Sequence, residues 1–420
     1  MTDAIRRQID AVWRMESARL IAALARLLRD VGVAEEMAQD ALVAALESWP
    51  EAGVPDNPAA WLMTTAKNRA LDRLRRASWL AQKQDEVTRE IEEQLAAAQV
   101  DPVDGADDPY GDDLLRLIFT ACHPVLTTEA RVALTLRLLG GLSTDEIARA
   151  FLTPEATIAQ RIVRAKRSLT DARVPFEVPR GEDAAERLAS VLEVIYLIFN
   201  EGYSATAGVE WMRPALCDEA LRLGRILATL APHESEVQGL AALMEIQASR
   251  LHARVGPDRE PVLLLDQNRA RWDRLLIRRG LDALARAESR AGGQPGPYAL
   301  QAGIAACHAR ARTAEETDWA RIAALYAQLA ELAPSPVVEL NRAVALGMAQ
   351  GPAAGLAHAD RLQSEPKLRD YHLLPSVRGD FLFKLRRLDE ARAEFERAAE
   401  LTRNERERAL LLQRAARCAA

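Results

Sequence analysis

Apolar residues recur along most of the chain at intervals of three and four, the spacing that puts them on one side of an α-helix. One such stripe lies in residues 34–49 and consists of Ala38, Ala41, Leu42, Ala45, Leu46 and Trp49. The polar residues between them are expected to face outward: Glu35, Glu36, Gln39, Asp40 and Glu47. Runs of β-branched residues are scarce, and aromatic residues make up only 5% of the chain. The pattern therefore predicts an all-α protein.

A second helix is predicted for residues 57–77, because Asn57 is a good N-cap residue and Pro58 suits the first helical turn. Its expected buried stripe consists of Met63, Ala66, Ala70, Leu74 and Ala77. The opposite side carries amide and guanidinium groups, which suit contacts with a nucleic-acid backbone and with base edges. Asp72 is expected to orient a neighbouring arginine, since no second carboxylate accompanies it for acid–base chemistry.

The segment LSTDEIARAFLTPEATIAQRIVRAKRSL, residues 142–169, predicts two short helices joined by a turn. Ser143 and Glu146 form a capping box for the first helix, and Thr153 with Pro154 would begin the second. The second helix has a buried stripe of Ile158, Ile162, Ala165 and Leu169. Its other side is polar and cationic: Thr157, Gln160, Arg161, Arg164, Lys166 and Arg167. This is the pattern of a helix-turn-helix, whose second helix enters the DNA major groove, although a purely structural hairpin would look similar.

Charge is distributed unevenly over the 420 residues, whose formal net charge is −6. Residues 61–80 carry five cations and one anion, whereas residues 81–113 carry two cations and eleven anions. Residues 114–173 carry nine cations and five anions. Two basic helical segments therefore flank an acidic connector, and each could neutralise phosphates. From charge alone, two solvated helix faces are an equally good interpretation.

Other classes of protein are disfavoured by what the sequence lacks. The N-terminus has no apolar segment typical of a secretory signal, and the most apolar stretch, Leu188–Phe199, is too short to span a bilayer. Four widely spaced cysteines suggest a reducing cytoplasm. The pairs Cys122-His123 and Cys307-His308 have no companion motif, so we expect buried thiols, no metal and no cofactor. No GxSxG, HExxH or GxxxxGK pattern occurs, and we predict no enzyme.

The C-terminal half predicts further helices with short loops. Small residues recur there with a period of 36 residues: Ala343, Gly355 and Ala359 are followed by Gly379, Ala391 and Phe395. This period indicates tetratricopeptide-like repeats, which bind proteins or peptides on a concave surface. A second group of residues indicates either a polar pocket or a buried structural network: Glu201, Tyr203, Asp266, Arg271, Trp272 and Asp273.

Taken together, the N-terminal segments resemble the extracytoplasmic-function (ECF) sigma factors of bacterial RNA polymerase. Residues 34–49 resemble their region 2.2, residues 57–76 regions 2.3 and 2.4, and residues 142–169 region 4.2. The resemblance covers about residues 5–172 and implies a region 2 domain in 1–80, an acidic linker in 81–111 and a region 4 helix-turn-helix domain in 112–173. Residues 184–420 form a helical extension, and the segments 196–205 and 262–274 resemble a sigma subgroup with such an extension.

The resemblance also implies roles for individual residues. Glu36, Gln39 and Asp40 would bind the clamp helices of the polymerase β′ subunit, and the loop 50–57 would hold a base flipped out of the −10 element. The −10 element would be contacted by Asn68, Arg69, Asp72, Arg73 and Arg76. Ala159, Gln160, Val163 and Arg164 would face the −35 major groove, with Thr157, Arg161 and Arg167 nearer phosphate. Arg69 departs from the apolar residue that the family usually has there, which leaves the −10 preference open.

Two rival interpretations remain. A stand-alone helix-turn-helix regulator with a helical sensing domain would bind duplex DNA without polymerase. Alternatively, a scaffold protein would use its repeats for function and its N-terminal half only as a tether. Two basic helices in the order found in sigma factors disfavour both.

Overall fold

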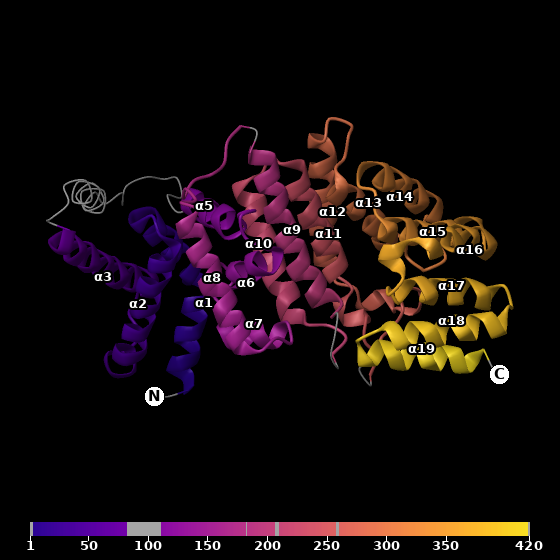
Figure 1. The fold of residues 1–420 in the computed structure, drawn as a ribbon, viewed down its shortest axis with the longest axis horizontal. Coiled ribbons are helices and arrows are strands. Elements are labelled where there is room, and N and C mark those ends of the chain that lie inside the picture. The colour runs from indigo at the N-terminus through magenta and orange to yellow at the C-terminus, as the bar shows by residue number, and fades with distance from the viewer. Residues whose placement is uncertain (1–2, 82–110, 182, 206–209, 258–259, 419–420) are drawn as a thin grey trace. The chain divides into compact units, whose positions relative to one another are not determined.

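The computed structural model describes residues 3–81, 111–181, 183–205, 210–257 and 260–418. Within these ranges the secondary structure is helical, apart from one isolated antiparallel bridge between Val255 and Pro261. The prediction of an all-α protein is therefore confirmed. The chain divides into two compact units, Met1–Ile195 and Tyr196–Ala420 (Figure 1).

The N-terminal unit begins with three packed helices, α1 (Asp3–Leu28), α2 (Val31–Ala52) and α3 (Pro58–Ala81). The predicted inward stripe of α2 is largely correct, since Ala38, Ala41, Ala45 and Trp49 are buried. The Trp49 ring packs edge-on against Trp61 of α3, with centroids 5.4 Å apart. In α3 the predicted stripe needs one correction, because Leu62 is buried and Met63 is only half-buried.

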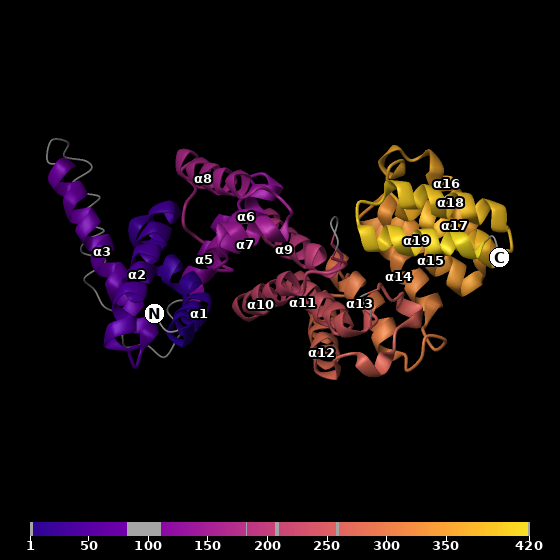
Figure 2. The same cartoon turned by 90° about the horizontal axis from the view of Figure 1, so that it is seen from below.

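In the described part of this unit, four shorter helices lie between α3 and α9. They are α5 (Gly111–Ala121), α6 (Thr128–Leu138), α7 (Thr144–Ala150) and α8 (Glu155–Asp171). Helix α8 packs on α6 and α7, and contacts with α1 and α2 join this group to the first three helices (Figure 2). The predicted acidic linker, residues 81–111, lies almost entirely outside the described residues. The domain boundaries predicted from the sequence stay predictions.

Helix α9 (Asp183–Tyr203) contains the division between the two units. The C-terminal unit then consists of helices that pack mainly on their neighbours in the chain. Its α-helices are α10 (Pro214–Leu230), α11 (Ser235–Ala248), α12 (Arg274–Arg290), α13 (Pro297–Arg310), α14 (Trp319–Leu332), α15 (Pro336–Gln350), α16 (Pro352–Arg361), α17 (Leu373–Lys384), α18 (Leu388–Leu401) and α19 (Glu405–Arg417). Among the described residues, short 3₁₀ turns lie between them at Leu251–Ala253, Leu264–Asp266, Arg269–Arg271, Leu362–Ser364 and Pro366–Leu368.

Small residues allow close helix packing near the C-terminus. A Cβ atom added to Gly355 would lie 2.5 Å from the Phe381 ring, and one added to Gly379 would lie 2.8 Å from the Phe395 ring. Ala343, Ala359 and Ala391 are fully buried. The residues that recur with the 36-residue period therefore lie at helix contacts. Assignment of these helices to tetratricopeptide repeats stays a prediction.

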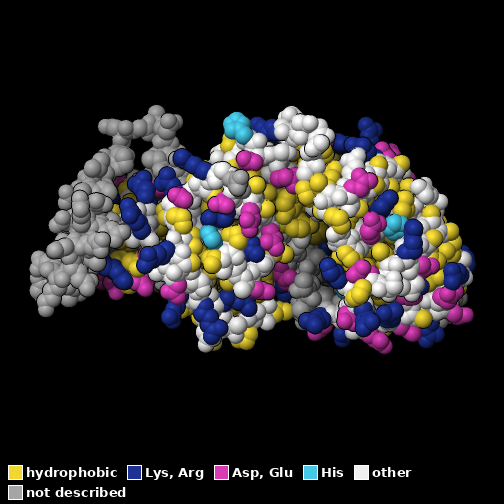
Figure 3. All heavy atoms as spheres, turned by 45° about the horizontal axis from the view of Figure 1, so that its top comes forward, with side chains coloured by type: hydrophobic (Ala, Val, Ile, Leu, Met, Phe, Trp, Pro, Cys, Tyr) yellow, Lys and Arg dark blue, Asp and Glu magenta, His cyan; other side chains and the backbone are white. Residues whose placement is uncertain are grey.

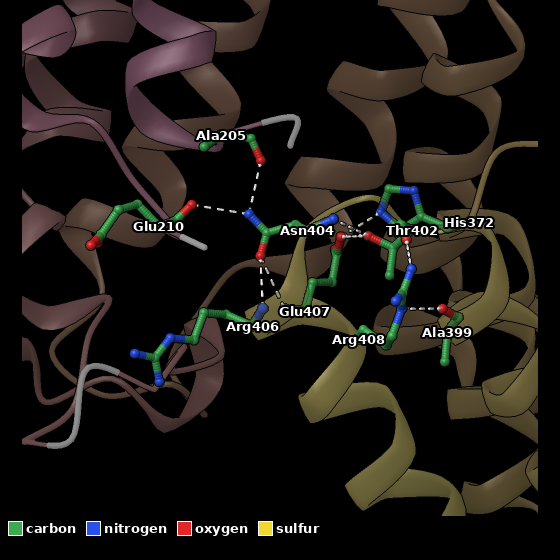
Figure 4. A network of polar contacts seen from close by, with 9 residues as sticks. All are labelled: Ala205, Glu210, His372, Ala399, Thr402, Asn404, Arg406, Glu407 and Arg408. Atoms are coloured by element: carbon green, nitrogen blue, oxygen red, sulfur yellow. Dashed lines mark hydrogen bonds and ion pairs between the residues drawn. The ribbon is translucent and has the colours of Figure 1, made fainter. Parts of the chain in front are cut away.

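A polar network joins the last helix of the C-terminal unit to its first loop (Figure 4). Asn404 caps α19, because its Oδ1 accepts from the backbone N–H groups of Arg406 and Glu407. Its Nδ2 donates to the carbonyl oxygens of Ala205, at 3.2 Å, and Glu210, at 3.0 Å. One buried side chain therefore links segments about 200 residues apart in the chain.

Candidate nucleic-acid interface

Helix α7 begins as the sequence predicts, whereas α8 begins differently. Ser143 Oγ accepts from the Glu146 N–H, and Glu146 Oε2 accepts from the Ser143 N–H, so the predicted capping box is confirmed. Thr153, however, is not the N-cap of α8, because its hydroxyl donates to the Phe151 carbonyl at 3.1 Å. Pro154 takes the N-cap position, its carbonyl accepts from the Thr157 N–H, and α8 begins at Glu155.

Helix α8 separates a buried stripe from an exposed polar face. Ile158, Ile162, Ala165 and Leu169 are buried, as predicted. Thr157, Gln160, Val163, Arg164 and Arg167 are exposed, whereas Ala159 and Arg161 are half-buried. Val163, an apolar side chain on this face, is 64% exposed. Figure 3 shows Lys and Arg side chains, in dark blue, gathered on part of the N-terminal unit.

Helix α3 presents a second polar face. Asn68, Asp72, Arg73 and Arg76 are exposed and Arg69 is half-buried. Asp72 Oδ1 lies 3.3 Å from Arg75 Nη1, so this carboxylate does pair with a neighbouring arginine, as predicted.

Ion pairs connect this face of α3 to the acidic face of α2. Arg73 Nη1 lies 3.0 Å from Glu36 Oε2, and Arg69 Nη1 lies 3.5 Å from Asp40 Oδ2. All four side chains keep substantial contact with solvent, so each pair contributes at most about 1 kcal/mol to stability. The residues proposed for polymerase contact and those proposed for −10 contact are thus direct neighbours.

The burial of Glu35 differs from the prediction. We expected its carboxylate on the outer face of α2, but the residue is only 3% exposed. Arg137 Nε of α6 lies 2.6 Å from Glu35 Oε1, Lys166 Nζ of α8 pairs with Oε2, and Gln39 Nε2 donates to Oε1. Lys166 was predicted on the solvent face of α8 and instead turns toward α2, because a buried carboxylate requires cationic partners.

Further polar contacts join the helix-turn-helix to α1 and α2. Arg14 Nη2 lies 2.7 Å from Glu146 Oε1, and Thr170 Oγ1 donates to Asp30 Oδ2 at 3.2 Å. Asp30 Oδ1 also caps α2 by accepting from the Val33 N–H at 2.9 Å. Charged and capping groups of α1 and of the start of α2 therefore hold the helix-turn-helix against these two helices.

A metal site, a reactive thiol and a membrane-spanning helix each place requirements on the described residues. They contain no cluster of three or more histidine, cysteine or acidic side chains that could hold a metal ion. All four cysteines are buried free thiols, and burial raises the pKa of Cys122 to about 11 and that of Cys217 to about 12. In the same part of the chain, no helix combines the length and apolar character needed to cross a bilayer.

Three family models match separate, successive parts of the chain. Residues 13–80 match sigma-70 region 2, which corresponds to most of α1 with α2 and α3. Residues 116–169 match sigma-70 region 4, which contains the helix-turn-helix. Residues 187–288 match a family of unknown function, DUF6596.

Curated relatives agree with this division. An uncharacterized protein of Rhizobium meliloti (strain 1021) is 45% identical over 390 residues, which cover 93% of this chain and 90% of that protein. A probable ECF RNA polymerase sigma factor, SigI of Mycobacterium tuberculosis, is 28% identical over 170 residues, which are 40% of this chain and 57% of SigI. The ECF RNA polymerase sigma factor SigK of Mycobacterium bovis is 33% identical over 157 residues, which are 36% of this chain and 78% of SigK. The chain therefore belongs to the ECF sigma factors of RNA polymerase.

Proposed function

We propose that this sigma factor binds core RNA polymerase in the cytoplasm, places α8 on the −35 element and α3 on the −10 element, and opens the promoter without covalent chemistry. The observation that carries the proposal is the exposed polar face of α8, opposite a fully buried stripe on the same helix. A helix held in this way presents side chains to the major groove and needs no rearrangement of its own core.

At the −35 element, Gln160 and Arg164 would read base edges. Both side chains are exposed on α8, and amide and guanidinium groups make bidentate contacts with adenine and guanine. Arg167 is exposed near the helix end and would contact phosphate, as would Thr157 and Arg161. Ala159 and Val163 would add apolar contacts with the bases.

At the −10 element, the proposed DNA-binding residues are Asn68, Arg69, Asp72, Arg73 and Arg76, and the proposed polymerase-binding residues are Glu36, Gln39 and Asp40. The ion pairs Arg73–Glu36 and Arg69–Asp40 support a coupling between these surfaces. Polymerase contacts that engage Glu36 and Asp40 would release the two arginines toward DNA.

Binding both elements at once requires region 4 to leave region 2. The elements are centred about 25 base pairs apart, which is ~85 Å of duplex at 3.4 Å per base pair. Helix α2 packs on both α3 and α8, and packed helices lie about 8–10 Å apart, so α3 and α8 are about 20 Å apart near these contacts. We propose that polymerase separates the two regions. Gln39 donates to Glu35 and belongs to the proposed polymerase surface, so it would sense this binding.

The C-terminal unit is proposed to regulate the sigma regions through a protein or peptide bound by its helices. The observation in favour is the size of this unit, Tyr196–Ala420, which a minimal sigma factor does not need. The Rhizobium relative shares it, because the match covers 93% of this chain.

The deciding experiment is run-off transcription with the full chain, purified core polymerase and a promoter library. We expect initiation only from templates that share a −35 and a −10 sequence. Arg164→Ala and Arg76→Ala should change the preference at one element each. A protein that shifts duplex DNA alone and directs no initiation would instead be the stand-alone helix-turn-helix regulator.

A further inference from the structure

The C-terminal unit contains an arginine–aromatic cluster, which we define as Arg250, Arg254, Arg269, Tyr203, Trp272 and Tyr326. Arg250 follows α11, and its guanidinium carbon lies 5.9 Å from the Tyr203 ring centroid and 5.8 Å from that of Trp272. Trp272 belongs to the core formed by α11, α12 and α13. Trp272 and Arg269 come from the connection between α11 and α12, and Tyr203 ends α9.

Arg250 is a buried cation that has no acidic partner among the described residues. The residue is 7% exposed, its Nη2 donates to Gln247 Oε1, and its Nε has no hydrogen-bond partner in the described part of the chain. Burial lowers its pKa, and neighbouring Arg254 lowers it further, although the nearby Tyr203 ring opposes this. An ionised group buried without a counter-charge costs several kcal/mol, so this arrangement requires an explanation.

The other two arginines of the cluster add positive charge. Arg254 lies 3.7 Å above the Tyr203 ring and donates to the Tyr203 carbonyl. Arg269 lies 4.8 Å from the Trp272 ring and donates to the carbonyl oxygens of His308 and Ala311. Among the described residues, neither forms an ion pair, although Glu315 and Glu316 lie close enough to act on Arg269. The neighbouring His308 stays neutral, since burial together with Arg250 and Arg269 lowers its pKa to about 3.

Some arginines elsewhere in this unit, more exposed than Arg250, are paired with carboxylates. Arg225 Nε lies 2.7 Å from Glu245 Oε1, and Arg378 Nε lies 3.0 Å from Glu394 Oε1. These pairs show how the chain neutralises a guanidinium that has only a structural role. Arg250 and Arg269 are buried more deeply and form no ion pair among the described residues.

Hydrogen-bond donors and accessible rings accompany this charge. Trp272 Nε1 is buried without a hydrogen-bond partner in the described residues, as is Arg250 Nε. Tyr203, Tyr326 and Arg254 are half-buried, so the cluster is reachable from solvent at that side. Four of the six tyrosines of the chain lie here or against the same core, because Tyr196 and Tyr298 pack on it. A guanidinium beside rings of this kind suits a ligand with both an anionic and an apolar part.

We propose that the arginine–aromatic cluster binds a small organic anion, whose carboxylate or phosphate group pairs with Arg250 and Arg254 while its remaining atoms stack on Tyr203 and Trp272. The ligand would supply the counter-charge that the protein lacks, and it would give the DUF6596 segment, which contains five of the six residues, a binding role. The proposal does not depend on promoter recognition.

The test compares thermal unfolding of the full-length protein in 10 mM phosphate, citrate or adenosine monophosphate with unfolding in chloride at the same ionic strength. Phosphate and citrate also stabilise proteins by exclusion from their surfaces, so the informative quantity is the difference between wild type and Arg250→Met. We expect at least one anion to raise the wild-type melting temperature by about 2 °C or more beyond any rise in the variant. The three anions represent three ligand classes: phosphate is inorganic, citrate carries carboxylates, and adenosine monophosphate joins a phosphate to an aromatic base.

Arg250→Met also separates binding from a structural role. Replacing an unpaired buried cation by an apolar side chain of similar length should leave the melting temperature in chloride unchanged or raise it. Arg271→Met is the matched control, because Arg271 is exposed in the same connection and carries the same charge. Arg250→Lys keeps the charge but loses the planar donor pair, and it should bind the active anion at least about 10-fold more weakly.

Two results would overturn the proposal. One is a wild-type protein that gains no more from any of the three anions than Arg250→Met does. The other is an Arg250→Met protein that unfolds at a much lower temperature in chloride, since Arg250 would then act through internal contacts. If Arg250→Met does not fold, an equal response to the active anion in Arg250→Lys and wild type would contradict the proposal.

Discussion

Buried Glu35 of α2 and half-buried Arg137 of α6 form an ion pair that joins region 2 to region 4, with Arg137 Nε 2.6 Å from Glu35 Oε1. Lys166 of α8 pairs with the other carboxylate oxygen. A single carboxylate therefore contacts two helices of the region that carries the helix-turn-helix. Arg137 Nη1 also donates to the Leu142 carbonyl, so the pair fixes the turn that precedes α7.

Glu35→Gln should weaken the contact between the two regions. The substitution leaves Arg137 and Lys166 partly buried opposite a neutral amide, and removal of one partner of a buried pair costs about 3–5 kcal/mol. We expect the free protein to open, as measured by energy transfer between dyes on α3 and α8. Glu47→Gln, an exposed position on the same helix, is the control. Equal transfer efficiencies in both variants would show that Glu35 does not hold region 4.

Local patterns in the sequence predicted much of this unit. The buried stripe Ile158, Ile162, Ala165 and Leu169 depends only on helical spacing, and the Ser143–Glu146 capping box depends on four residues. The partners of Glu35 could not be predicted in the same way, because Arg137 is 102 residues away in the sequence. A side chain at the edge of a helix's apolar stripe is buried or exposed according to the elements that pack against it.

The C-terminal unit shows the same limit. From the group of residues predicted as a polar pocket or a buried network, Tyr203 and Trp272 both lie near Arg250. Asp266, Arg271 and Asp273 from the same group are exposed, and Asp273 caps α12. Glu201 instead pairs with Arg213. Arg250 does not belong to any local sequence motif. Its position beside the Tyr203 and Trp272 rings depends on the tertiary fold.

Gly379→Ala should destabilise the C-terminal unit. The added Cβ would lie 2.8 Å from the Phe395 ring, which is fully buried and cannot move without disturbing its neighbours. Overpacking of this kind costs about 1–3 kcal/mol, more than the ~1 kcal/mol that alanine contributes in a helix. Gly303→Ala is the matched control, because its Cβ would lie at an ordinary 3.4 Å from Leu325. Denaturant unfolding should show a lower free energy of unfolding for Gly379→Ala and a higher one for Gly303→Ala. A Gly379→Ala protein more stable than wild type would contradict the close contact with Phe395.

Asn404→Ala should loosen the link between α19 and the first loop of the C-terminal unit. The change removes the cap of α19 and leaves the carbonyl oxygens of Ala205 and Glu210 without this donor. We expect a loss of about 1–3 kcal/mol in unfolding free energy. The backbone amides of α19 should exchange their hydrogens with solvent faster in the variant than in wild type. The exposed cap Asn268, changed to alanine, provides the comparison and should have a smaller effect.

Arg164→Ala should weaken −35 recognition and leave the fold intact. The side chain is exposed on α8 and has no ion pair among the described residues, so its removal disturbs no internal contact. Loss of one base contact costs about 1–3 kcal/mol, which is roughly 5- to 150-fold in promoter affinity of the polymerase complex. Run-off transcription from promoters that differ at single −35 positions should show the preference relaxed at one position. Arg149→Ala, which removes an exposed arginine paired with Asp145 on α7, controls for the change in charge. Because phosphate contacts act on all sequences alike, a uniform loss across the promoters would place Arg164 on the backbone instead of on a base.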